Sequence, residues 1–195
     1  MTERLMPHPA RLTDRWPTAL AIIFGSGAIT VIALVGREAA LFGPAVATMA
    51  GIYLMAYAVG RPWTAWPAFL VLSAVVSVLH VVWQSRLLPL DPATGMAFVL
   101  VPLWLWAVAR RRFTDVATFS IQTGGAVGFG GLTLLCAAAQ PQLGAVLAGI
   151  GFLTHGVWDA YHFRVGKVVS RPWSEFCAVV DLVVGTALIV AAAAG

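Results

Sequence analysis

Apolar runs of about 20 residues recur along the whole chain, and short breaks rich in charged residues, proline or glycine separate them. A helix of that length crosses the ~30 Å hydrocarbon layer of a bilayer. The pattern predicts seven such helices, at residues 17–36, 39–59, 64–86, 93–109, 115–138, 142–163 and 174–194. No polar stretch between them is long enough for a second, water-soluble domain. We therefore predict an all-α fold, a polytopic helical bundle that forms a single transmembrane domain over residues 1–195.

The composition agrees with this interpretation. Hydrophobic residues make up 60% of the chain and charged residues only 10%, whereas a soluble domain carries about 25% charged residues. A single globule exposed to water is therefore excluded. The two cysteines, Cys136 and Cys177, lie inside predicted helices, and we expect no disulfide between them.

The first apolar run is preceded by arginines, as a signal peptide would be. It is longer than a signal-peptide core, and no cleavage site of small residues follows it before Gly36. We therefore expect a retained first helix, with residues 1–16 as a cytoplasmic N-terminal segment.

The distribution of basic residues predicts the orientation. With the N-terminus in the cytoplasm, ten of the 12 Lys and Arg residues fall on the cytoplasmic side. These are Arg4, Arg11, Arg15, Arg61, Arg110, Arg111, Arg112, Arg164, Lys167 and Arg171. Only Arg37 and Arg86 fall on the other side, so the C-terminus is predicted to lie outside. The net charge of +4 thus reflects topology rather than binding to nucleic acid. The bilayer of a bacterial inner membrane is the expected surrounding.

Polar residues inside the sixth run are the main candidates for function. His155, Asp159 and His162 are spaced at i, i+4 and i+7, which places them within an arc of roughly 60° on one helix face. Toward the N-terminus the same face continues through Gly144, Ala148 and Gly151. Small residues at this spacing allow a neighbouring helix to approach closely.

Asp181 in the seventh run is expected to meet this polar face. Counting from the cytoplasmic ends of the two predicted helices, Asp181 and His155 both lie about 12 Å deep. Because a short turn joins these helices, they run antiparallel, and the two side chains can meet. We consider His155, Asp159 and Asp181 as candidate catalytic residues, and the same three with His162 as candidate ligands of a divalent metal ion.

The third run carries a second polar stripe, which could form the outer half of a polar path through the membrane. Its members share one helix face and are Ser73, Ser77, His80 and Gln84. Counting from residue 64, His80 lies about 24 Å from the cytoplasmic side, so we do not expect it beside Asp159 or His162. The segment His80-x-x-Trp83 echoes His155-x-x-Trp158, either as part of an inverted repeat or by chance. Inter-helix hydrogen bonding is the alternative role of this stripe.

The C-terminal pattern as a whole has a recognisable form. It consists of His155-x-x-Trp158-Asp159-x-x-His162, a basic turn, and then Ser174-x-x-Cys177-Ala178-x-x-Asp181. Over about the last 40 residues this resembles the signature of a family of small uncharacterised bacterial multi-pass membrane proteins. Members of that family carry a second histidine where this chain has Phe163. The resemblance implies a shared site and brings no activity with it.

Three classes of function remain open from the sequence. The His/Asp site could bind a metal ion or perform acid/base chemistry on a lipophilic substrate held between helices. The polar stripes could instead conduct protons, a cation or a small solute. The protein could also be an accessory or assembly subunit of a membrane complex, in which the polar residues only fix the packing.

Overall fold

The computed structural model describes residues 15–35 and 42–194, which form seven α-helices and no strand. The helices are α1 (Trp16–Val35), α2 (Gly43–Val59), α3 (Ala65–Gln84), α4 (Pro92–Ala109), α5 (Val116–Ala138), α6 (Pro141–Val165) and α7 (Arg171–Ala194). Two short 3-10 turns, η3 (Pro62–Thr64) and η4 (Arg112–Thr114), precede α3 and α5.

The helices follow the apolar runs closely, and six of them are long and apolar enough to cross a membrane. The exception is α2, which has 17 residues. Some of the predictions fall outside the described residues. They concern residues 1–14, the start of the second run at 39–41, and Arg37. The all-helical class is confirmed, whereas the count of seven spans and the orientation stay predictions.

The breaks between runs contain the residues that start and stop helices. Proline stands in the first turn of α2, α4 and α6, where its missing N–H costs no hydrogen bond. The side chains of Asp91 and Asp115 accept hydrogen bonds from the first turns of α4 and α5. Gly60 and Gly166 end α2 and α6 in the left-handed conformation that glycine adopts without strain.

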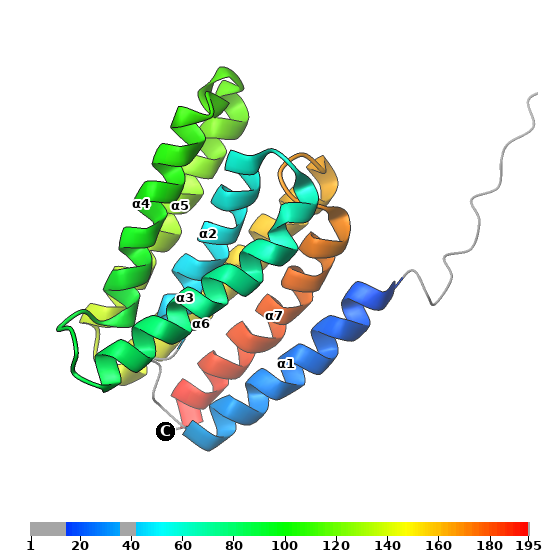
Figure 1. Cartoon of the computed structure of the whole chain (residues 1–195). Coiled ribbons are helices and arrows are strands. Elements are labelled where there is room, and N and C mark those ends of the chain that lie inside the picture. Colours follow the sequence, from blue (N-terminus) through cyan, green and yellow to red (C-terminus); the bar gives the residue numbers. More distant parts are fainter. Residues whose placement is uncertain (1–14, 36–41, 195) are drawn as a thin grey trace, which may run out of the picture.

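The short helix α2 lies inside the bundle, in contact with α3, α4, α5 and α6, whereas α1 lies on the outside against α7 (Figure 1). Nearly every residue of α2 is buried, including Val46, Tyr53 and Leu54. Helices α3 to α6 therefore enclose α2, and its polar side chains Thr48, Tyr53 and Tyr57 are buried within the protein.

Helices α6 and α7 approach each other closely at Gly149 and Gly185. A Cβ atom added to either glycine would lie 2.9 Å from the carbonyl oxygen of the other. The predicted small-residue face of α6 packs elsewhere, since Gly151 meets Val46 of α2 and Gly144 meets the backbone of Cys136 on α5. The expected close packing of Gly144, Ala148 and Gly151 is confirmed, and Gly149 adds a second close face.

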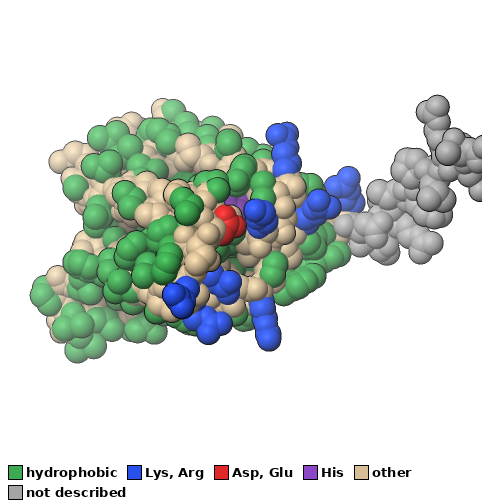
Figure 2. Space-filling model, turned by 90° about the horizontal axis from the view of Figure 1, so that it is seen from above, with side chains coloured by type: hydrophobic (Ala, Val, Ile, Leu, Met, Phe, Trp, Pro, Cys, Tyr) green, Lys and Arg blue, Asp and Glu red, His purple; other side chains and the backbone are tan. Residues whose placement is uncertain are grey.

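The loops that follow α2, α4 and α6 lie at one end of the bundle (Figure 1). Figure 2 looks onto this end and shows Lys and Arg side chains gathered there. The loop between α3 and α4, which contains Arg86, lies at the opposite end (Figure 1). The described residues thus show the charge separation on which the predicted orientation depends.

Candidate intramembrane site

The core of the candidate site is a contact between His155 on α6 and Asp181 on α7. His155 lies ten residues before the end of α6, and Asp181 lies ten residues after the start of α7. Both are therefore about 15 Å from the basic end of the bundle. His155 Nδ1 lies 2.8 Å from Asp181 Oδ2, and both side chains are fully buried. The predicted meeting of these two residues is confirmed.

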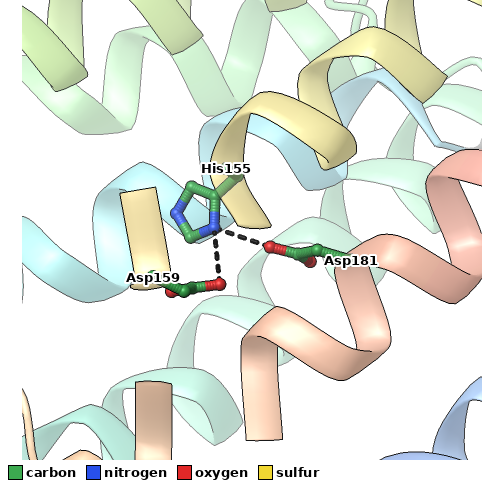
Figure 3. A group of neighbouring side chains, drawn as sticks. All are labelled: His155, Asp159 and Asp181. Atoms are coloured by element: carbon green, nitrogen blue, oxygen red, sulfur yellow. Dashed lines mark hydrogen bonds and ion pairs between the residues drawn. The ribbon is translucent and has the colours of Figure 1, made fainter. Parts of the chain in front are cut away.

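Asp159 brings a second carboxylate to the same imidazole nitrogen. It lies one turn after His155 on α6, and its Oδ2 is 3.4 Å from His155 Nδ1 (Figure 3). The ligand atoms of His155, Asp159 and Asp181 lie within 4.8 Å of one another. The buried Asp159 Oδ2 has no hydrogen-bond partner among the described residues. The three side chains therefore converge on one point, and the single proton that His155 Nδ1 can carry leaves Asp159 Oδ2 without a hydrogen-bond donor among the described residues.

When ionised, the two carboxylates carry more negative charge than His155 can balance. An imidazole nitrogen carries at most one proton, so His155 Nδ1 has a single proton for the two oxygens that face it. With both carboxylates ionised, even a protonated His155 leaves the group with a net negative charge. In a dry interior such a charge is costly. The group is thus suited to bind a cation or an additional proton.

Tyr53, which the sequence did not point to, completes the group from α2. Its hydroxyl donates a hydrogen bond to Asp159 Oδ1, and the whole side chain is buried. The Tyr53 ring also packs edge-on against His155, with ring centroids 5.3 Å apart. Helix α2 carries only Thr48, Tyr53 and Tyr57 as polar side chains, and these form no polar stripe, so only the packing of α2 inside the bundle identifies Tyr53.

His162 lies on the same face of α6 but is bonded elsewhere. Its Nδ1 is 2.9 Å from the carbonyl oxygen of Trp158, so this nitrogen must carry the proton. In the neutral ring Nε2 then accepts a hydrogen bond from the Gln122 amide of α5, at 2.8 Å. Both nitrogens are therefore occupied, and the structure does not bring His162 into the group of His155, Asp159 and Asp181.

Aromatic side chains separate His155 from the outer surface of the bundle. The Phe129 ring packs against His155 with centroids 5.0 Å apart, and Trp158 lies over Gly125. Outside these rings, α5 and α6 form a mainly apolar groove of about 310 Å³, whose lining includes Phe129, Trp158, Gly124, Gly125 and Gly128. His155 Nε2 is buried and has no partner among the described residues. Phe129 therefore borders both the groove and the imidazole.

The polar stripe of α3 is not brought to this site. Ser77 and Gln84 are exposed, and Ser73 and His80 are half-buried. The Ser77 hydroxyl donates to the carbonyl of Ser73, and His80 Nδ1 donates to that of Val76, one turn back in the same helix. No hydrogen bond joins the stripe to the His155 group among the described residues. A conducting role for Ser73, Ser77, His80 and Gln84 remains a prediction.

Comparisons of the chain with protein-family models, with curated proteins and with solved structures found no match. The similarity of the C-terminal pattern to small bacterial membrane proteins therefore stays a prediction. A functional assignment depends on the geometry of the chain itself, and this geometry defines a buried His/Asp group within a bundle of apolar, membrane-compatible helices.

Proposed function

We propose that this protein is a multi-pass protein of a bacterial inner membrane that binds a divalent transition-metal ion through His155, Asp159 and Asp181. One observation supports this most strongly. Two carboxylate oxygens on two helices face a single imidazole nitrogen, and one of them, Asp159 Oδ2, has no hydrogen-bond partner among the described residues. A cation between His155 Nδ1 and the two carboxylate oxygens would bind both oxygens at once.

Charge balance favours a divalent ion at this position. Two carboxylates and a neutral imidazole carry two negative charges, which a divalent cation cancels in full. An imidazole nitrogen with two carboxylate oxygens is a donor set that zinc, manganese and iron ions use in proteins. The Tyr53 hydroxyl donates to the other oxygen of Asp159 and would thereby orient this carboxylate toward the ion.

The surroundings favour chemistry on a lipophilic substrate over a purely structural role. Three protein ligands leave a coordination position for water or substrate, as in catalytic zinc sites. His155, Asp159 and Asp181 would hold the ion, which would supply Lewis-acid chemistry there. The groove between α5 and α6 offers an approach from the lipid side, with Phe129 as the side chain that must turn aside.

A proton site is the second candidate, supported by the contact with Tyr53. Hydrogen bonds link Asp181 to His155 and Tyr53 to Asp159, and an ion-pair distance of 3.4 Å joins the two halves. Such a chain can hold and pass a proton within the membrane. It would make the protein a transporter rather than a metal-dependent enzyme.

Metal analysis of the purified protein separates these roles. After equilibration with Zn²⁺ and removal of the excess, the wild type should retain about one ion per chain. Asp181→Asn should lose it, because the amide keeps the shape and removes the charge. Asp91→Asn is the control, since Asp91 caps α4 outside the site. Equal zinc in all three proteins contradicts metal binding at this site, and proton flux in liposomes that requires Asp181 then favours the second candidate.

We also infer that α2 is a seventh membrane span, with the N-terminus in the cytoplasm and the C-terminus outside. The enclosed position of α2 and the gathering of basic loops at one end support this topology. Reporter fusions after Arg112 and after Gly195 should then report opposite compartments. Two cytoplasmic reports would show that the number of spans is even.

A further inference from the structure

A second feature of the molecule, remote from the His155 group, is a cavity at the basic end of the bundle. It has a volume of about 630 Å³ and lies between the end of α2, the loop from α4 to α5, and the loop from α6 to α7. Four cationic side chains line it, namely Arg110, Arg111, Arg112 and Lys167.

The only acidic residue of this lining does not neutralise it. Asp115 accepts hydrogen bonds from the backbone and side chain of Thr118, at 3.2 and 2.8 Å. These bonds, with Lys167 at 3.8 Å, lower the pKa of Asp115, so its carboxylate is ionised at neutral pH. One negative charge against four positive ones leaves the lining with three net positive charges.

Arg112 is held in place at the wall of the cavity. Its Nε and Nη2 atoms both donate to the carbonyl oxygen of Ala58, at 3.3 Å each. Its guanidinium lies directly over Gly60, where an added Cβ would be 1.8 Å from Nη2. The Tyr57 hydroxyl donates to the carbonyl of Arg112 and fixes the backbone there. No described residue accepts a hydrogen bond from Nη1, so this donor is available to a ligand. Because Arg112 is already held in this way, it loses little further conformational freedom when it binds an anion.

The position of the cavity indicates the kind of anion. Gly60 and Arg110 directly follow the last residues of α2 and α4, so the lining begins where the apolar helices end. In a bilayer this is the level of the phosphate groups, and basic pockets between helices at this level bind acidic headgroups. The volume exceeds what a bare phosphate ion needs and is within the range of sites for small organic ligands.

We propose that this cavity binds the phosphate group of an organic phosphate at the membrane surface, with Arg110, Arg111, Arg112 and Lys167 as its cationic wall. The phosphate is either the headgroup of an anionic lipid or part of a soluble phosphate ester. The proposal is independent of the metal site, because no residue of the His155 group lines the cavity.

The test compares two charge-matched double variants of the full chain in nanodiscs. Arg110→Gln with Lys167→Gln removes two charges from the lining. Arg61→Gln with Arg164→Gln removes two exposed charges at the same end that do not line the cavity. In nanodiscs of phosphatidylcholine with phosphatidylglycerol, native mass spectrometry measures how much phosphatidylglycerol stays bound to the protein. In nanodiscs of phosphatidylcholine alone, calorimetry measures the binding of glycerol phosphate.

The cavity variant should bind the phosphate probe about 30-fold more weakly than the wild type, and the control variant should bind like the wild type. Lys167→Gln alone should weaken binding about fivefold, which keeps the test valid if the double variant does not fold. Cavity-dependent retention of phosphatidylglycerol identifies a lipid headgroup, and cavity-dependent binding of glycerol phosphate identifies a soluble ester. Equal weakening in both double variants, or no binding of either probe by the wild type, overturns the proposal.

Discussion

Two histidines in the same local pattern have opposite surroundings in this molecule. His155 on α6 and His80 on α3 are each followed three residues later by tryptophan, and each belongs to a polar helix face. His155 is fully buried and meets two carboxylates, one of them on the neighbouring helix α7. His80 is half-buried, and its Nδ1 donates to the carbonyl of Val76 in its own helix. The same pattern therefore meets polar side chains of other helices at His155, whereas at His80 the only hydrogen bond among the described residues is to its own helix, and His80 Nε2 has no partner there.

The difference lies in what the neighbouring helices bring. Helix α6 packs against α7, α5 and α2, which supply Asp181, Gln122 and Tyr53 to its polar face. Helix α3 contacts α2 and α4, and its residues Ser77 and Gln84 face outward. A polar stripe thus becomes a site only where adjacent helices carry polar partners at the same depth.

The largest contrast is expected when each histidine is removed. His155→Ala leaves two buried carboxylates without a cationic partner, and should lower the free energy of unfolding by about 3–5 kcal/mol. His80→Ala should change it by no more than about 0.5 kcal/mol, because its main hydrogen bond is within its own helix. Denaturation of both variants in mixed micelles measures the difference. Similar losses in the two variants would remove the distinction between the stripes.

A smaller effect is expected from the close approach that brings the two polar faces together. Gly149→Leu places a side chain against the backbone of Gly185, and should cost about 1–3 kcal/mol by forcing α6 and α7 apart. Gly131→Leu is the control, since a Cβ there meets nothing within 4 Å. Thermal unfolding followed by helix content compares them. An unchanged midpoint for Gly149→Leu would show that the two helices do not need this approach.

Much of this arrangement follows from the sequence, and the rest depends on how the helices are ordered in space. Run lengths and breaks predicted the helix bounds to within a few residues, because hydrocarbon thickness fixes the length of a span. Counting residues from the loop between α6 and α7 was enough to pair His155 with Asp181. Tyr53 could not be assigned in this way, since its helix α2 is not adjacent in sequence to α6. Periodicity likewise identified the polar stripe of α3, but it does not show whether neighbouring helices bring polar side chains to that stripe.

The smallest effect concerns the hydroxyl that α2 contributes. Tyr53→Phe removes the hydrogen bond to Asp159 while keeping the ring, and should cost about 1 kcal/mol, as inter-helix hydrogen bonds in membranes do. Ser77→Ala on α3 should be neutral or slightly stabilising, because its hydroxyl bonds only to its own helix. The same mixed-micelle denaturation measures both. A loss for Ser77→Ala as large as that for Tyr53→Phe would mean that the α3 stripe has partners too.

The most direct measurement is X-ray absorption at the zinc edge of the protein loaded with Zn²⁺. If His155, Asp159 and Asp181 hold the ion, the spectrum should show only nitrogen and oxygen neighbours at about 2.0–2.2 Å, with scattering from one imidazole. The His80→Ala variant should give the same spectrum, and the His155→Ala variant should bind no stoichiometric zinc. Scattering from sulfur at about 2.3 Å, or an unchanged spectrum in the His155→Ala variant, would contradict the proposed site.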